Sequence, residues 1–196
     1  MYDTINANTV RQIRGDMRFL HTTKFQALVV VLALLTLPGE ASAELYYNQR
    51  HRFSIDAPTG WAVKNSTQPY TIVKFVHRDR EGNIAVLSIA ADDESWLGAL
   101  IPLTADRMYD GFKDEYRDFT VRRLASGTTK IRSMDSVWNL IEITDPPQAR
   151  IIGKHYHLRR NGKLWRISAM TDSGKAFFET VLPAMEKSIA TLAFGL

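Results

Sequence analysis

The sequence contains no cysteine. It therefore cannot form a disulfide, a thiolate metal site or a cysteine nucleophile, and it offers no cysteine for lipidation after a signal peptide. A domain without such cross-links must gain its stability from buried apolar surface and backbone hydrogen bonds. With 196 residues, the chain is long enough for one domain with a substantial core.

Motifs of the common enzyme classes are absent as well. The sequence has no Gly-x-Ser-x-Gly nucleophile elbow, no Walker glycine loop, no Gly-x-Gly-x-x-Gly fingerprint and no His-Glu-x-x-His zinc motif. Its serines are scattered, without the glycines that would frame a nucleophile. These absences predict a protein that is not an enzyme and that carries no cofactor.

A basic face is also missing. Of the 25 basic and 21 acidic residues, four and three lie in residues 1–43, which leaves 21 and 18 and a formal charge of +3. The Arg-Arg pairs at 122–123 and 159–160 stand at predicted strand ends, whereas nucleic-acid binding requires a basic face or stripe. Nucleic acid is therefore not an expected partner.

Residues 1–43 have the organisation of a secretory signal peptide. Residues 11–24 carry four basic side chains, residues 27–37 are apolar except for one threonine, and residues 41–43 read Ala-Ser-Ala, a cleavage signature. We expect cleavage after Ala43 and a periplasmic or secreted location. The alternative is an uncleaved anchor, but the apolar run is short for a bilayer span.

The mature chain is expected to be one domain, residues 44–196, without a stable membrane span. Met17 followed by Arg18 would begin a signal peptide of more usual length, so residues 1–16 need not belong to the native product.

The stretch 53–61, Phe-Ser-Ile-Asp-Ala-Pro-Thr-Gly-Trp, organises the predicted domain. Phe53 and Ile55 alternate with polar residues, as in a half-buried strand. Pro58 and Gly60 then favour a tight turn, because proline fixes φ and glycine adopts positive φ readily. We expect Trp61, placed beside this turn, to pack on the core.

The clearest local prediction is a hairpin with Asn161-Gly162 at its turn, between strands 150–160 and 163–171. A two-residue turn fixes the register. It places Leu158 opposite Trp165 and Tyr156 opposite Ile167 on a buried face. On the other face, it places His157 opposite Arg166 and His155 opposite Ser168.

Further elements follow from periodicity and from turn residues. Residues 84–91 are nearly all apolar, which is typical of an interior strand covered on both faces. Residues 105–117 form an amphipathic helix capped by Thr104, with an apolar stripe of Met108, Tyr109, Phe112 and Tyr116. The other expected elements are strands 71–77 and 119–124, one or two strands within 130–143, a turn at 126–129, two short helices or one kinked helix around Pro183 with Asp172 or Ser173 as the cap, and a terminal strand within 192–196.

This order of elements resembles the PsbP-like family. The resemblance rests on Phe53 to Trp61, on Gly-Lys-Leu-Trp-Arg-Ile at 162–167, and on the ending 178–194 with its internal Pro183. It implies an α+β fold, an α/β/α sandwich around a mainly antiparallel sheet. The family includes extrinsic subunits of the oxygen-evolving complex, bacterial envelope proteins without a known role and a Ran-binding import factor.

Family members act mostly by docking onto partners, so the resemblance implies a protein partner in the envelope and no shared catalytic residues. The chain departs from the photosynthetic pattern in two respects. Almost nothing lies between the predicted cleavage site and Tyr46, where those proteins have a long docking arm, and no cysteine is available for lipidation.

His155 and His157 form the best metal candidate, because residues at i and i+2 of a strand project from the same face. Arg166, predicted opposite His157, disfavours a cation there. The alternative is a solvated polar face or a docking patch made of His155, His157 and Arg166. The acidic run 92–94 has the ligand type for a hard cation but lacks the spacing of a calcium loop, which favours a solvated turn.

Residues 96–103, beginning with Trp96, are apolar for a connection. They would form either a flap or docking surface, or a lid that completes the core beneath the 105–117 helix; the lid is the favoured interpretation. Three functions follow. The first is an exported accessory or docking protein, the second a small-ligand or metal carrier, and the third a hydrolase, which would require a histidine bonded to a serine in a cleft.

Overall fold

A computed structural model describes residues 43–66, 70–145 and 149–195, with the side chains of 96, 97, 145 and 149 left out. Within these residues the strands form two antiparallel sheets, with the orders β3-β4-β5-β9-β8-β7-β6 and β1-β2-β10. The elements are β1 (Leu45–Asn48), β2 (Phe53–Asp56), β3 (Ala62–Asn65), β4 (Thr71–Arg78), β5 (Ile84–Asp93), α2 (Trp96–Leu100), α3 (Ala105–Glu115), β6 (Thr120–Ile131), β7 (Met134–Asp145), β8 (Ala149–Arg160), β9 (Lys163–Thr171), α4 (Gly174–Thr191) and β10 (Ala193–Phe194).

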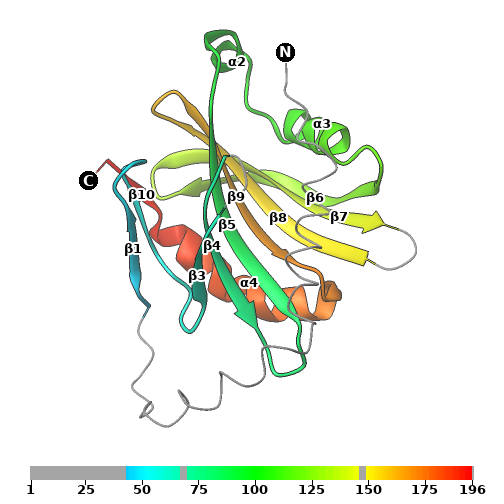
Figure 1. The fold of residues 1–196 in the computed structure, drawn as a ribbon. Helices are drawn as coiled ribbons and strands as arrows, with labels where there is room; N and C mark the ends of the chain where they lie inside the picture. The colour runs from blue at the N-terminus through cyan, green and yellow to red at the C-terminus, as the bar shows by residue number, and fades with distance from the viewer. Residues whose placement is uncertain (1–42, 67–69, 146–148, 196) are drawn as a thin grey trace. The chain divides into compact units, whose positions relative to one another are not determined.

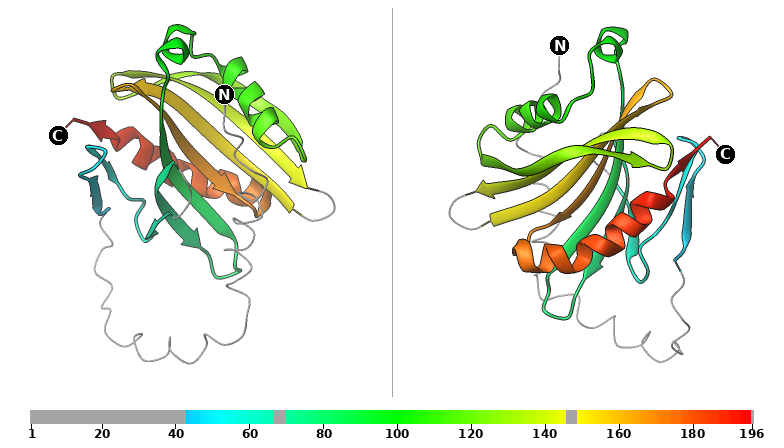
Figure 2. Two further views of the ribbon diagram at one scale, coloured as in Figure 1. Left: turned by 45° about the horizontal axis from the view of Figure 1, so that its top comes forward. Right: turned by 180° about the vertical axis from the view of Figure 1, so that it is seen from behind.

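The larger sheet is covered on both faces, which confirms the predicted α+β sandwich. Helix α4 and the small sheet lie against one face, where α4 contacts β9, β8 and β2. Helix α3 lies on the opposite face, over β6 and β7 (Figures 1 and 2). None of the helices in the described ranges is long and apolar enough to cross a membrane.

The main core lies between the larger sheet, α4 and the small sheet. Trp165 of β9 is 1% exposed, and its ring lies 5.5 Å from that of Phe53 in β2 and 4.5 Å from that of Phe194 in β10. One aromatic side chain therefore contacts two strands of the small sheet from the larger one. The other large, fully buried members are Ile55, Phe75, Leu87, Ile89, Leu158, Ile167, Met185 and Leu192.

The turn after β2 has the predicted form. The N–H of Trp61 donates to the carbonyl of Pro58 at 3.0 Å, and Gly60 has φ +77°. Trp61 packs against the main core and stacks on His77, with ring centroids 5.4 Å apart. The predicted core role of Trp61 is therefore confirmed.

The hairpin of β8 and β9 also has the predicted register. Leu158 pairs with Trp165, and Tyr156 pairs with Ile167, and all four side chains are buried in the main core. Asn161 and Gly162 both have positive φ, 53° and 68°, as a type I′ turn requires.

One local prediction is wrong. Residues 126–129 form no turn, because β6 continues through them and the chain reverses at Arg132 and Ser133, where Arg132 has φ 53°. Of the two forms expected around Pro183, two short helices or one kinked helix, the structure has a single helix, α4, with Pro183 inside it. Proline in a helix interior costs roughly 3 kcal/mol. Burial of one side of α4 against the sheet, including Phe178 and Met185, offsets this cost.

Gly127 lies inside strand β6, where the absence of a side chain leaves room for the ring of its cross-strand partner, Trp138. A Cβ at position 127 would lie 2.9 Å from the Trp138 ring. Gly127→Ala should therefore lower the free energy of unfolding by about 1–3 kcal/mol. Gly111→Ala in α3 is the matched control, because nothing lies within 4 Å of its added Cβ and alanine favours a helix. Urea unfolding should show opposite signs for the two variants; equal effects would contradict the contact with Trp138.

Candidate functional site

The predicted site residues lie in two places. His155, His157 and Arg166 lie on the face of β8 and β9 that is turned toward α3, with the predicted cross-strand partners. Trp96 begins α2, and its side chain lies outside the described residues. The structure therefore does not bring the four residues into one exposed surface.

The prediction that the two histidines lie on a solvated face or docking patch is wrong. His155 and His157 are 3% and 5% exposed, and their rings lie 4.5 and 5.7 Å from the ring of Phe112. Helix α3, whose predicted cap at Thr104 is confirmed, places Phe112 over them. Arg166 of the same face forms an ion pair with Glu115 of α3 at 2.8 Å. The histidines are therefore packing residues beneath a helix.

Burial determines the charge of the pair. Desolvation, with the positive charge of Arg166 second, lowers the pKa of His157 to about 3. The pKa of His155 is also well below its usual value, because of burial first and then the charges of Arg166 and His157. Both imidazoles are therefore neutral near pH 7. Among the described residues, three buried polar side-chain atoms have no hydrogen-bond partner: His155 Nε2, His157 Nδ1 and Asn139 Oδ1.

This arrangement fits a metal site poorly. Neutral imidazoles can bind zinc, but a protein site needs at least three ligands. No group of three or more His, Asp or Glu side chains that could hold an ion exists in the part of the chain that the structure describes. The guanidinium of Arg166 adds repulsion for any cation.

A serine–histidine contact does exist, and it bears on the hydrolase hypothesis. Ser168 Oγ lies 2.8 Å from His155 Nδ1. However, Ser168 is only 4% exposed, and the other ring nitrogen of His155 has no partner in the described part of the chain, where no carboxylate orients the imidazole. A nucleophile needs both access to substrate and an oriented base. The pair therefore lacks the features of a triad.

The second place is the connection between β5 and α3, which forms a projection at one end of the domain (Figures 1 and 2). Leu100 is 72% exposed and Ile101 is 48% exposed. The favoured interpretation of residues 96–103 as a core lid is therefore wrong at these two positions. They form an apolar tip that faces water.

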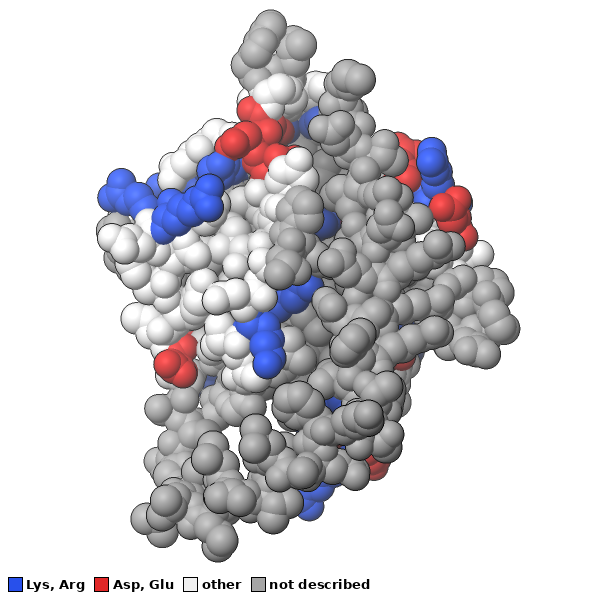
Figure 3. All heavy atoms as spheres, viewed as in Figure 1, with Lys and Arg blue, Asp and Glu red and all other residues white. Residues whose placement is uncertain are grey.

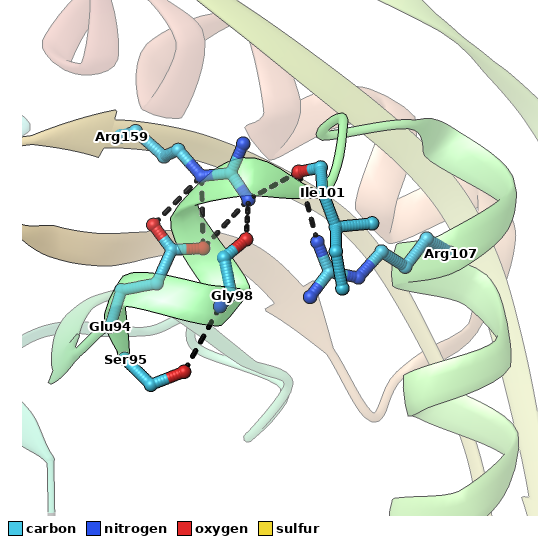
Figure 4. A network of polar contacts seen from close by, with 6 residues as sticks. All are labelled: Glu94, Ser95, Gly98, Ile101, Arg107 and Arg159. Atoms are coloured by element: carbon cyan, nitrogen blue, oxygen red, sulfur yellow. Dashed lines mark hydrogen bonds and ion pairs between the residues drawn. The ribbon is translucent and has the colours of Figure 1, made fainter.

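The tip is held by Arg159, which extends from β8 (Figure 4). Its guanidinium binds both carboxylate oxygens of Glu94 at 2.7 to 2.9 Å, and its Nη2 donates to the carbonyls of Gly98 and Ile101 at 2.8 Å. The Glu94 side chain is 8% exposed, so the expected solvated acidic turn is wrong for this residue. Ser95 caps α2 by accepting from the Gly98 N–H at 3.0 Å.

Arg159→Ala should loosen α2 without unfolding the domain. Removing one partner of a buried ion pair costs roughly 3–5 kcal/mol. Because Arg159 keeps part of its side chain in water, we expect the local stability of α2 to fall by about 2 kcal/mol. Hydrogen exchange of the Gly98, Ala99 and Ile101 amides should accelerate strongly in this variant. Arg160→Ala, which removes the exposed neighbour, is the control and should leave these amides unchanged. Equal protection in both variants would show that Arg159 does not hold the tip.

We define the α2 end by three segments: residues 49–52 between β1 and β2, residues 92–104, and residues 159–163 around the β8–β9 turn. The N–H of Glu94 donates to the Gly162 carbonyl at 3.0 Å, which joins the second segment to the third. The His51 ring lies 6.3 Å from that of Trp165, which places the first segment beside the same hairpin. The three segments of the α2 end are therefore neighbours, and the sequence suggested a site only in the 92–94 and 96–103 parts.

No family model matches the sequence, and none of the curated proteins matches it. Solved structures do. One is the cyanobacterial PsbP protein of Synechocystis sp. PCC 6803, with a TM-score of 0.56 and 15% identity over 84% of this chain and 99% of that one. The chain has a PsbP-like fold. A second is a protein of unknown function from Pseudomonas aeruginosa, described as a putative regulator, with a TM-score of 0.51 and 12% identity over 79% and 99% of the two chains.

At such identities the likeness concerns the fold alone. The PsbP-like architecture agrees with the resemblance carried by residues 53–61, 162–167 and 178–194. Neither likeness assigns a partner or an activity to this chain.

Proposed function

We infer that this chain is an exported, non-enzymatic accessory protein of the cell envelope, which acts by docking its α2 end onto another envelope component. The observation that carries the proposal is the pair Leu100 and Ile101, two aliphatic side chains in water on a segment that Arg159 fixes in place. Leaving apolar side chains in water while fixing the backbone beneath them is typical of a binding surface.

Two further points support the proposal. The predicted signal peptide, cleaved after Ala43, would deliver the domain to the periplasm or the exterior. The buried histidines, the best metal candidates in the sequence, are packed beneath Phe112. No observation specifically favours the alternative of a small-ligand or metal carrier.

A photo-reactive amino acid at position 101 of the full-length protein tests this function. Irradiation of intact cells should give one dominant adduct, protein or lipid, identified by mass spectrometry after purification from the envelope. The control places the same amino acid at position 45, because Leu45 is 63% exposed on β1, outside the α2 end. Adducts of equal yield and identity at both positions would show that the tip has no dedicated target.

A further inference from the structure

The α2 end is basic as well as apolar. Its three segments carry Arg50, Arg52, Arg159, Arg160 and Lys163 against Asp92, Asp93 and Glu94, five positive and three negative side chains, a formal charge of +2. Figure 3 shows Lys and Arg side chains gathered at this end beside a group of carboxylates.

Ion pairing neutralises two of these carboxylates locally. Asp93 pairs with Lys163, and Glu94 pairs with Arg159. Arg50 and Arg160 are exposed, and neither forms an ion pair with a described residue. Arg50 lies in the β1–β2 connection and Arg160 at the β8–β9 turn, so both belong to the α2 end, whose formal charge is positive.

The α2 end therefore combines an apolar tip with an excess of basic side chains, the two signals by which peripheral proteins bind membranes. Aliphatic side chains enter the boundary between headgroups and acyl chains, and Lys or Arg side chains are attracted to anionic lipids. We propose that the α2 end binds the surface of an anionic lipid bilayer, with Leu100 and Ile101 inserted and with Arg50 and Arg160 at the headgroups. This inference rests on the proposed docking function and names the component that is docked.

The shape of the α2 end favours a bilayer over a protein. The apolar side chains lie on a projecting segment, and a protein partner would need a matching pocket, whereas a bilayer deforms around a convex tip. The basic side chains come from two separate turns and are long and flexible. Such charges suit a diffuse anionic surface better than directional pairing with individual carboxylates.

Vesicle co-sedimentation tests the proposal with the exported protein purified from the envelope. The vesicles are phosphatidylcholine alone or phosphatidylcholine mixed with phosphatidylglycerol. Binding should require the anionic lipid and should weaken as salt is raised. Residues 1–43, where they remain attached, are the same in every variant, so differences between variants report the α2 end.

Two double variants, each with a control, separate the contribution of charge to vesicle binding from that of the apolar tip. Arg50→Glu/Arg160→Glu should lower the partition coefficient at least about 25-fold, since each basic residue near the surface contributes about fivefold. Lys175→Glu/Lys187→Glu on α4 makes the same change in net charge with two exposed side chains elsewhere and should bind like the wild type. Leu100→Asp/Ile101→Asp should lower binding by at least about tenfold, whereas Leu45→Asp should not. Circular dichroism checks that each variant is folded.

The outcomes distinguish the inference from the docking function. Equal losses in the α2-end and α4 charge variants, or no binding to anionic vesicles, would overturn the bilayer proposal. If the photo-reactive residue at position 101 then gave a single protein adduct, docking would stand and its target would be a protein. Failure of both experiments would remove the docking function as well.

Discussion

Acidification from about pH 7 to about pH 4.5 is expected to lower the free energy of unfolding by about 3 kcal/mol through His157 alone. Its pKa is about 3 in the folded domain, against the ordinary value of 6.5. A proton therefore binds the unfolded chain more tightly than the folded one. The neutral side chain contributes its full stabilisation above pH 6.5, and this contribution is lost at about 1.4 kcal/mol per pH unit below that value.

His155 acts in the same direction, because its pKa is also lowered by burial. The groups around the pair add to the effect. Arg166 repels a protonated imidazole, while its partner Glu115 is engaged by the guanidinium at 2.8 Å. Since a domain of this size has only about 5–15 kcal/mol of stability in total, the two histidines make α3 an acid-sensitive part of the fold.

Urea unfolding across this pH range provides the measurement. His157→Gln removes the titrating group but keeps a polar side chain, so the loss of stability on acidification should shrink by about 3 kcal/mol. Carboxylates whose pKa is lowered by arginine or lysine, such as Glu142 and Glu186, contribute equally in wild type and variant and cancel in the difference.

A packing control separates titration from contact loss. Phe112→Leu loosens the contact over both histidines without removing an ionisable group, so it should destabilise the domain at every pH while keeping the pH dependence of the wild type. If His157→Gln and Phe112→Leu had the same pH dependence, the histidine would not be the acid-sensitive group.

The histidines also show which features sequence reasoning could predict. Asn161-Gly162 determined the register of β8 and β9, so the partners of His155 and His157 on β9 were predicted correctly, whereas those on β7 were not predicted. The burial of the two histidines was not predicted either. The apolar stripe of residues 105–117 shows that the helix covers something, but no local pattern states which strands it covers. The alternation of side chains along β8 does not show which face is buried, because both faces of the sheet are covered.

Other errors have the same origin in contacts between distant residues. The Ser-Gly-Thr-Thr run at 126–129 has turn composition, but Gly127 serves to admit the ring of Trp138 across the ladder. Glu94 looks solvated in the sequence because its partner, Arg159, lies 65 residues away. Local propensity is overridden wherever a tertiary contact satisfies a residue in another way.

The second large effect is expected for Trp165→Ala, which should cost about 3–5 kcal/mol. The side chain is 1% exposed, and its ring contacts Phe53 and Phe194, so it joins the larger sheet to two strands of the small one. Its Nε1 donates to the Arg160 carbonyl at 3.2 Å, beside the β8–β9 turn of the α2 end. Removing the ring therefore leaves a cavity and also frees this turn.

Two comparisons make this prediction specific. Trp61→Ala removes the same side chain from a half-buried position stacked on His77 and should cost only about 1–2 kcal/mol. Trp165→Phe should recover much of the apolar contact but not the hydrogen bond to Arg160. Thermal or urea unfolding should rank the losses as Trp165→Ala, then Trp165→Phe or Trp61→Ala. A loss for Trp165→Ala no larger than that for Trp61→Ala would mean that the small sheet is held to the larger one by α4 and not by this tryptophan.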